Sequence, residues 1–569
     1  MDYKHYKQRP ESLTAEFIQA EFDILFSKIE EAENYETPEK WISLYLDWNA
    51  LKSYIGSEGS RIGYEFSKDM SNKKIEDEEE YFREKVSPIS SNGSSKILDS
   101  FLKSRYKSDV GKKFGEHLIA VLETSVKPLA PINTDLNVKL SSLSNTYNKI
   151  VSSGFVTVSG EKVTLPVARS KQASSDPETR KEAFLNHRNW FLNHHDELGK
   201  IFHEMVALRH QMALNLGFKN FIELGYLSMG RTDYGPQQAK QFRDSVRKFV
   251  VPLQSQMLKK QAQELGTQTL KCWDTEYCPS CTLPVGIAPI ENQLDNAEKV
   301  FDSLDVKLAD YFRKMRNENL IDLENRVGKR SGAFCTSFPD EGRVAILCNS
   351  TGDQGDVGTL MHEMGHAFQG WESQPIEAID LQWPTSDACE IHSMGMEYLA
   401  LQQLHYFFSE EHRIKFSQGR WREAIGLMTY ICIVDEFQHW VYENFNSTME
   451  ERDNAWVTIW KIYKPDVDYS MDEKLIYARW YSQLHIIDMP FYYIDYAIAE
   501  TGAMQLAIQD LKDHKIAMEK YIRLCQIGGT KSVLEIFNDV EFTSPFDENI
   551  IKFLMDKAAS ILHLNAELN

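Results

Sequence analysis

The stretch GTLMHEMGHAFQGW, residues 358–371, contains two histidines four positions apart, and a glutamate directly follows the first of them. In a helix, His362 and His366 lie on one face with their Cβ atoms about 5–6 Å apart. Both imidazoles can then reach one metal ion at about 2.0–2.1 Å. Glu363 is turned about 100° from His362, beside the ion and toward its bound water. The spacing therefore predicts a metal-binding helix, provided that its surroundings supply the remaining groups.

Neighbouring residues favour a helix at this point. Asp356 is a candidate N-cap, and Gly370 is a candidate for the end of the helix. Gly365 lies in the middle, where glycine costs about 1 kcal/mol relative to alanine. This cost indicates that another segment approaches closely at Gly365.

A third ligand is expected on a second helix, which begins after Pro384 with a cap at one of residues 385–387. Glu390 lies early in this helix and is the candidate, although the charge of an ordinary first-turn residue is the alternative. Glu397 follows seven residues later on the same face. We expect it to accept a hydrogen bond from a ligand histidine.

The segment LHIIDMPFYYIDYAIAETGA, residues 484–503, offers hydrogen-bond donors for a developing oxyanion. His485 precedes a predicted helix start at 488–490, and Tyr493 and Tyr496 are then three apart on one helical face. An aromatic stripe in the core is the alternative. The combination of a histidine with several hydroxyl groups favours a polar site, because each polar group needs a partner when buried.

Other histidines fit packing or surface positions better. His203 and Glu204 begin the same motif without a second histidine, and His210 lies two turns away. Glu436 and His439 have the spacing of a carboxylate-bridged di-iron site, but no second copy of that motif exists.

Composition excludes several classes of protein. Of 569 residues, 42% are hydrophobic and 26% charged, which is typical of a globular protein with a large core. The formal net charge of −21 argues against a nucleic-acid partner, because phosphate binding needs a basic face. No apolar run reaches the ~18 residues of a membrane span, and the first residues lack the apolar region of a signal peptide.

Eight cysteines are scattered between Cys272 and Cys525, as expected for reduced thiols in the cytoplasm. Cys278 and Cys281 have CxxC spacing, but no second CxxC exists to complete a zinc site. We interpret their segment as an extended loop.

The sequence is helical in pattern along most of its length. Residues 87–96 predict a loop, and residues 156–170 predict a hairpin around Gly160. Asp176 is a candidate N-cap for the helix that follows it. We place a domain boundary near residue 170, with an N-terminal helical domain over 1–170 and the site-bearing helical domain over 171–569.

Before the metal motif, residues 332–338 and 343–349 form two short strand-like runs joined by a turn. A hairpin here either offers a free edge to an extended peptide or only covers the core. The residues themselves leave both interpretations open.

Taken together, these segments resemble the thimet-oligopeptidase family of zinc peptidases, and within it the oligoendopeptidase F branch. The resemblance covers about two-thirds of the chain. It runs through NLGFKNFIELGYLSMGRTDY (215–234), SGAFCTSF, TLMHEMGHAF, CEIHSMGMEY, VDEFQHWVYEN and HIIDMPFYYIDYAIAETGA. The family's third ligand is a glutamate in an E-x-x-S context, which Glu390 and Ser393 match. His392 and Met489 depart from residues common in the family.

The resemblance implies a mostly α, elongated zincin-type fold with a small β-hairpin beside the HExxH helix and a deep substrate channel. It implies one Zn²⁺ per chain, held by His362, His366 and Glu390. It carries over Glu363 as general base. The same resemblance carries over His485, Tyr493 and Tyr496 as groups around the scissile carbonyl.

We therefore expect a cytoplasmic zinc-dependent endopeptidase that hydrolyses internal bonds of short unstructured oligopeptides, without nucleic-acid or membrane partners. A zinc carboxypeptidase of similar fold, a catalytically silent peptide-binding relative and a non-catalytic scaffold are the alternatives. The sequence does not determine the oligomeric state.

Overall fold

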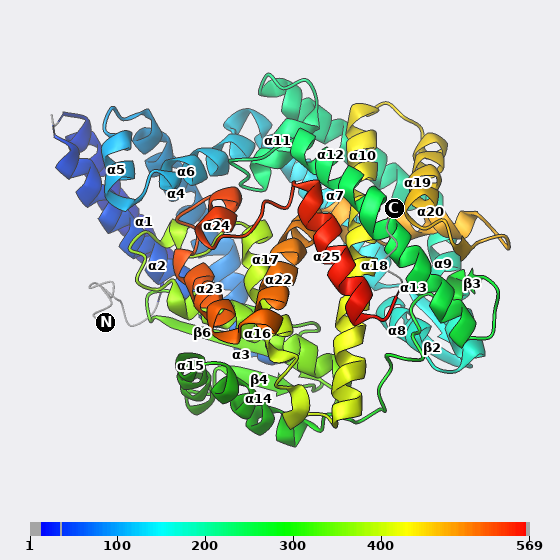
Figure 1. The fold of residues 1–569 in the computed structure, drawn as a ribbon. Coiled ribbons are helices and arrows are strands. Elements are labelled where there is room, and N and C mark those ends of the chain that lie inside the picture. Colours follow the sequence, from blue (N-terminus) through cyan, green and yellow to red (C-terminus); the bar gives the residue numbers. More distant parts are fainter. Residues whose placement is uncertain (1–12, 35–36, 565–569) are drawn as a thin grey trace. The chain divides into compact units, whose positions relative to one another are not determined.

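The computed structural model describes residues 13–34 and 37–564, and most of these residues are helical (Figure 1). Their strands form three small sheets: β1-β2 (Phe155–Val158, Glu161–Thr164), β3-β7 (Leu270–Lys271, Val467–Asp468) and β4-β6-β5 (Ile321–Glu324, Arg343–Ser350, Phe334–Phe338). The predicted mostly α fold with a small sheet beside the metal motif is confirmed. Among the described residues, no helix combines the length and apolar character needed to cross a bilayer.

The chain divides into two compact units, each built from separate stretches of sequence. Unit 1 comprises residues 1–126, 284–413 and 502–542, and unit 2 comprises residues 127–283, 414–501 and 543–569. This division follows spatial contacts rather than sequence order. The domain boundary near residue 170 therefore remains a prediction.

Unit 1 begins with helices that share an aromatic-rich core. In α1 (Ala15–Asn34) the buried residues recur every three or four positions, as in an amphipathic helix. They pack with Trp41 and Trp48 of α2 (Pro38–Lys68) and with Phe101 of α4 (Ser87–Lys103). The other elements of unit 1 are α3 (Lys73–Tyr81), α5 (Lys107–Phe114), α6 (His117–Val126), α14 (Ile290–Leu304), α15 (Val306–Asn317), β4 (Ile321–Glu324), β5 (Phe334–Phe338), β6 (Arg343–Ser350), α16 (Gln354–Glu372), α17 (Ser386–Ala400), α23 (His514–Ile527) and α24 (Val533–Asp539).

The predicted loop at 87–96 is wrong, because α4 covers these residues. The serines and glycine that favoured a loop lie on a helix held by tertiary contacts. Gly93 is buried, and a Cβ there would lie 2.4 Å from the ring of Phe22. The glycine therefore permits close packing of α4 on α1 rather than a turn.

The predicted hairpin before the metal motif is present as β5 and β6, which pair antiparallel from Phe338↔Arg343 to Phe334↔Leu347. A third strand, β4, adds to β6 in parallel. It was not foreseen, because its four residues alternate too briefly to stand out from the helix before it. Strand β6 is thus central, and β5 lies at one edge of this sheet.

Unit 2 is also helical, with two small sheets. The predicted hairpin around Gly160 is β1 (Phe155–Val158) and β2 (Glu161–Thr164), and Ser159 and Gly160 at its turn both have positive φ. Its predicted range of 156–170 is too long, because residues 165–170 form a short helix that begins with Pro166 in its first turn. Asp176 caps α9 (Pro177–Asn193) as predicted, accepting from the Thr179 N–H at 2.8 Å. The remaining elements are α7 (Thr134–Ser152), α8 (Leu165–Ser170), α10 (His195–Asn215), α11 (Phe221–Ser228), α12 (Pro236–Ser245), α13 (Val251–Glu264), β3 (Leu270–Lys271), α19 (Met449–Tyr463), β7 (Val467–Asp468), α20 (Lys474–Tyr481), α21 (Leu484–Ile487) and α25 (Glu548–Ile561).

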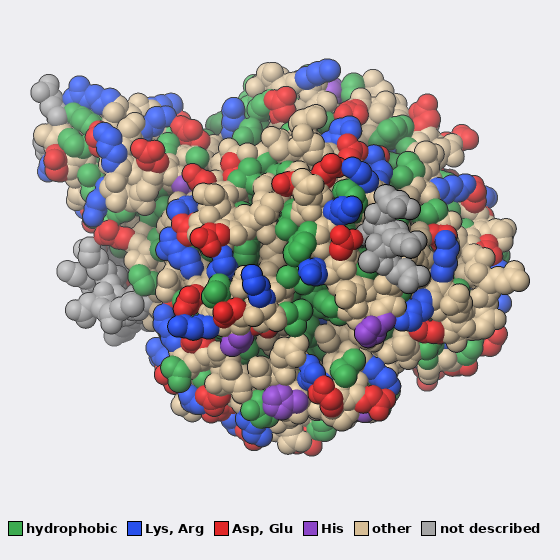
Figure 2. Space-filling view, in the orientation of Figure 1, with side chains coloured by type: hydrophobic (Ala, Val, Ile, Leu, Met, Phe, Trp, Pro, Cys, Tyr) green, Lys and Arg blue, Asp and Glu red, His purple; other side chains and the backbone are tan. Residues whose placement is uncertain are grey.

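Two long helices, α18 (Glu410–Glu443) and α22 (Ile494–Lys512), carry the chain from one unit to the other. Figure 2 shows acidic and basic side chains interspersed over the visible face. The excess of carboxylates in the composition is therefore not gathered there into one acidic surface.

Candidate functional site

The metal motif lies on α16 of unit 1, as its spacing predicts. The helix begins three residues earlier than expected, with Asp353 as N-cap and Asp356 as the reciprocal partner in a capping box. It also continues past Gly370. A Cβ at Gly370 would lie 2.7 Å from Val344 of β6, so this glycine allows sheet and helix to approach and does not end the helix.

Helix α17 packs directly against α16, and the two cross closely at Gly365. A Cβ on Gly365 would lie 2.6 Å from both the carbonyl oxygen of His392 and the Cα of Ser393. Tyr521 of α23 fixes the same crossing, since its hydroxyl lies 3.4 Å from the Gly365 carbonyl oxygen and 3.3 Å from that of His392. The predicted close approach at Gly365 is therefore confirmed.

The crossing brings the three candidate ligands together. Oε2 of Glu390 lies 3.4 Å from Nε2 of His362 and 3.6 Å from Nε2 of His366. The three ligand atoms all lie within 4.8 Å of one another. No other group of three His, Cys, Asp or Glu side chains among the described residues meets this condition.

This donor set fits zinc. Two ligands bound at about 2.0–2.1 Å with tetrahedral angles stand ~3.3 Å apart, close to the separations of the carboxylate oxygen from the two nitrogens. Two imidazoles and one carboxylate are a common catalytic zinc set, which leaves a coordination position for water or substrate.

Each of the three candidate ligands has a hydrogen-bond partner. Nδ1 of His362 lies 2.7 Å from Oε1 of Glu397, the acceptor expected from the helical spacing. Ser393 donates to Oε2 of Glu390 at 2.8 Å. The Nδ1 of His366 faces Sγ of Cys389 at 3.5 Å.

Burial and charge shift the pKa values of these groups. Burial lowers the pKa of His362, but its hydrogen bond to Glu397 and the nearby carboxylates outweigh this and raise it to about 9. Burial holds the pKa of His366 well below its ordinary value and raises that of Glu390. The site is thus a low-dielectric environment that holds several carboxylates close to the imidazoles.

Glu363 follows the first candidate ligand but is not among the three grouped atoms. Its side chain is 6% exposed, and burial raises its pKa to about 7. A carboxyl group whose pKa lies near neutrality is suited to accept and return a proton. Its charge also contributes to raising the pKa of Cys335 on β5, second to burial. The edge strand therefore lies near Glu363.

The other predicted residues lie in unit 2. His485 is on α21, and its ring stacks on Tyr493 with 4.4 Å between ring centroids. Tyr496 lies with its ring centroid 6.3 Å from that of His485, and its hydroxyl is 3.1 Å from that of Tyr492. All four side chains are partly exposed. The structure therefore brings His485, Tyr493 and Tyr496 into one cluster.

The helix start predicted at 488–490 is wrong, because α22 begins at Ile494. Tyr493 thus precedes the helix, and only Tyr496 lies on it. Phe491 interrupts helical geometry with a φ of 68°. Its carbonyl accepts from Arg231, and its N–H donates to Gln438 at 3.1 Å. These tertiary bonds hold an irregular segment where sequence periodicity indicated a continuous helix.

Two residues beside His485 were not among those predicted from the sequence. The side-chain amide of Gln483 donates to Nδ1 of His485 at 2.8 Å, and Tyr430 of α18 donates to the amide oxygen of Gln483 at 2.6 Å. This leaves the proton of a neutral His485 on Nε2. Burial and the charge of Arg479 lower the pKa of His485 to about 4, so the imidazole is neutral near pH 7. No sequence signal marked Gln483, because its role depends on Tyr430.

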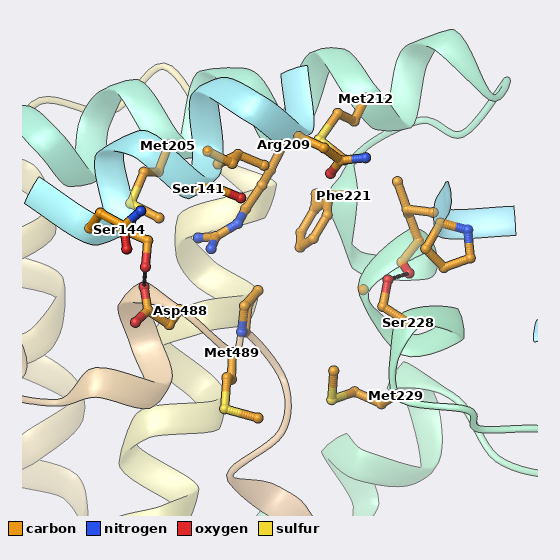
Figure 3. A pocket seen from close by; sticks show the side chains of 17 residues that line it. Ser141, Ser144, Met205, Arg209, Met212, Phe221, Ser228, Met229, Asp488 and Met489 are labelled. Atoms are coloured by element: carbon orange, nitrogen blue, oxygen red, sulfur yellow. Dashed lines mark hydrogen bonds between the residues drawn. The ribbon is translucent and has the colours of Figure 1, made fainter. Parts of the chain in front are cut away.

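Met489, one of the departures from the family pattern, lines a cavity of about 440 Å³ in unit 2 (Figure 3). Arg209 lines the same cavity and donates to the carbonyl of Ile487 at 2.5 Å. Asp488 accepts from Ser144 at 2.6 Å. These bonds anchor the segment that follows His485.

Other histidines pack as expected. The ring of His210 stacks on Phe445 with 3.5 Å between centroids. His439 is buried, with Nδ1 2.8 Å from the Asp435 carbonyl and Nε2 3.2 Å from the Tyr226 hydroxyl. Neither belongs to a candidate metal group.

Several known proteins are similar to this chain. The oligoendopeptidase F homolog of Borreliella burgdorferi is 24% identical over 379 residues, which cover 64% of this chain and 62% of that protein. The homolog of Mycoplasma genitalium is 25% identical over 357 residues, which cover 58% of this chain and 55% of that protein. The chain thus matches less than two-thirds of the length of each relative.

A solved structure described as PZ peptidase A with inhibitor 2 superposes with a TM-score of 0.88 at 30% identity, covering 98% of both chains. Residues 8–129 match the peptidase M3 N-terminal domain. Residues 171–555, more than half of the chain, match peptidase family M3, and the chain therefore belongs to that family.

Proposed function

We propose that the protein is a zinc-dependent endopeptidase that hydrolyses internal bonds of short unstructured oligopeptides. The observation that carries this proposal is the convergence of His362, His366 and Glu390 on one point, with Glu363 beside them. Membership of peptidase family M3 and the relatives named oligoendopeptidase F support it.

In this proposal His362, His366 and Glu390 hold one zinc ion per chain. A zinc ion supplies Lewis acidity, which polarises the scissile carbonyl and makes water a better nucleophile. Glu397 keeps the imidazole of His362 oriented through Nδ1. The Glu363 carboxylate takes a proton from the attacking water and returns it to the departing amine.

His485, Tyr493 and Tyr496 are proposed as donors to the oxyanion that develops on the carbonyl. Their partial exposure supports contact with a substrate. The low pKa of His485 and the hydrogen bond from Gln483 support a neutral imidazole with its N–H on Nε2. Such preorganised donors stabilise charge that appears only in the transition state.

Strand β5 is the proposed docking edge for the peptide. It pairs with β6 on one side, and no strand among the described residues pairs with its other side. Main-chain hydrogen bonds to an edge strand bind extended peptides and read little sequence. The substrate channel that the family resemblance implies would restrict access to unfolded chains. We also propose a cytoplasmic location, supported by eight cysteines that are all free thiols.

Peptides of graded length, acetylated and amidated at their ends, test the proposal together with a folded protein. We expect internal cuts in the short peptides, identified by mass spectrometry, and none in the folded protein. Stepwise loss of single C-terminal residues, stopped by amidation, would instead identify a carboxypeptidase. Stoichiometric zinc without any cleavage would indicate a peptide-binding relative, and protein without zinc a scaffold.

A further inference from the structure

Unit 2 contains three arginines on neighbouring helices, Arg169 on α8, Arg188 on α9 and Arg479 on α20. We call them the arginine cluster. Helix α9 packs against both α8 and α20. Arg188 and Arg479 are 6% and 7% exposed, whereas Arg169 is exposed, so the cluster extends from the interior to solvent.

Within the described residues, none of the three arginines forms an ion pair. Arg188 donates no hydrogen bond, and its Nε and Nη1 are buried without a partner. Arg479 donates to the Ser482 hydroxyl at 2.8 Å. By contrast, the other buried arginines of unit 2 have polar partners. Four pair with a carboxylate, as Arg180–Asp274, Arg231–Asp495, Arg243–Asp435 and Arg420–Glu500, and the remaining two, Arg209 and Arg452, donate to backbone carbonyls. An unpaired buried guanidinium is costly and calls for an explanation.

The charges of the cluster act on one another. The charge of Arg479 is the largest cause that lowers the pKa of Arg169. The pKa of Arg188 falls to about 10, first because of burial and second because of the charge of Arg479. Burial and Arg479 also lower the pKa of Lys464 to about 8. The charge of Glu276 acts on Arg169 and Lys464, but this exposed carboxylate forms no ion pair with the cluster. In a protein of net charge −21, the cluster is therefore a local concentration of positive charge without a paired carboxylate.

The cluster is connected to the proposed catalytic residues. The Arg479 guanidinium lies 4.6 Å from the ring centroid of Tyr430. The ring centroids of Tyr430 and Tyr493 are 6.0 Å apart, and those of Tyr493 and His485 are 4.4 Å apart. Each residue of an extended peptide spans ~3.3–3.6 Å, so a few residues separate a bond at His485 from the cluster.

We propose that the arginine cluster binds a carboxylate of the peptide substrate, a few residues from the scissile bond. Guanidinium groups bind carboxylates through paired, charge-assisted hydrogen bonds, and burial such as that of Arg188 and Arg479 strengthens them. The carboxylate is either the C-terminal group or an Asp or Glu side chain. This inference rests on the proposed function and adds a substrate preference to it.

Binding is measured on full-length Glu363→Gln protein with fluorescein-labelled octapeptides, because this variant is expected to turn the peptides over at least about 10²-fold more slowly. One peptide pair compares a free acid with an amide at the C-terminus. A second set compares Asp with Asn at each position of an amidated peptide. We expect at least one carboxylate peptide to bind roughly tenfold or more tightly than its neutral partner. The first comparison reports the terminal group, and the second reports the side chain.

Arg169→Gln and Arg188→Gln should abolish that preference in the same background. Lys200→Gln, which removes an exposed charge from α10, should leave it intact. Arg169 is exposed, so its variant tests the cluster even where a change at Arg188 disturbs folding. Equal binding of all paired peptides, or a preference that survives both arginine variants, would overturn the proposal.

A second measurement separates ligand binding from a structural role. Arg188→Met should raise the midpoint of thermal unfolding, since it removes a buried charge without a partner. A lowered midpoint with an unchanged peptide preference would identify a structural arginine and overturn the proposal. Wild-type protein that hydrolyses none of the peptides would refute the proposed function, while the binding comparison would still decide on the cluster.

Discussion

Nδ1 of His362 lies 2.7 Å from Oε1 of Glu397, which is 35 residues further along the chain and on a different helix. The bond orients the imidazole so that its Nε2 faces Glu390. We expect Glu397→Ala to weaken zinc binding by roughly 10–100-fold, because acceptors of this kind tune ligand orientation and basicity. Competition with a chromogenic chelator measures the change. Glu33→Ala, an exposed glutamate of α1, is the control, and equal affinities of both variants would contradict the role.

Removal of a candidate ligand tests the metal centre itself. His362→Ala, His366→Ala and Glu390→Ala should each lose the one zinc per chain that the wild type is expected to carry. Inductively coupled plasma mass spectrometry of the dialysed proteins gives the stoichiometry. Full zinc content and activity in all three variants would mean that the ion binds elsewhere.

Glu363→Gln should separate metal binding from chemistry. We expect zinc content to stay at the wild-type level, since Glu363 is not one of the three grouped ligands. Turnover should fall by at least about 10²–10⁴-fold, because an amide cannot accept the proton. Steady-state cleavage of a quenched fluorescent peptide measures the loss, and an unimpaired variant would remove Glu363 from the mechanism.

Gly365→Ala should destabilise unit 1. The added Cβ would lie 2.6 Å from backbone atoms of His392 and Ser393, which can move apart only if α16 and α17 separate. Overpacking of this kind costs about 1–3 kcal/mol, and urea unfolding measures it. Gly426→Ala on α18 is the matched control, because no atom lies within 4 Å of its added Cβ. That change should stabilise by up to about 1 kcal/mol. Similar effects at both sites would contradict the close crossing.

His195 gives a prediction for pH. Burial lowers the pKa of His195, but its hydrogen bonds to Asp453 and Asp196 outweigh this and raise the pKa above its ordinary value. When the pKa of a histidine is higher in the folded state, its protonation stabilises the fold. This stabilisation is complete below the unfolded-state pKa of about 6.5 and disappears as the pH rises through the folded-state pKa. His195→Gln should therefore cost most stability below about pH 6.5 and progressively less as the pH rises above it. Urea unfolding between about pH 5 and pH 9 measures the free energy of unfolding of this variant, and a change at the exposed His203, His203→Gln, is the control. A loss of stability that does not vary with pH would contradict the prediction.

The sequence alone determined what depends on local spacing. His362, Glu363 and His366 stand at the intervals that one helix requires, and Glu390 and Glu397 share a face two turns apart on the next helix. Asp176 and the hairpin at Gly160 were likewise identified by local rules of capping and turns. Such rules act within a few residues, so they can be applied without knowledge of the fold.

Tertiary structure decided what depends on contacts between distant segments. Glycines at 93 and 370 suggested breaks, yet both lie in helices because each allows a neighbouring element to pack closely. The chain leaves helical geometry at Phe491 because Arg231 and Gln438 bind its backbone there. Tyr430, Gln483 and the arginine cluster carry no signature in sequence, since their chemistry arises only where separate helices meet. Local periodicity reports which face of a helix is buried, but only the folded chain decides what that face contacts.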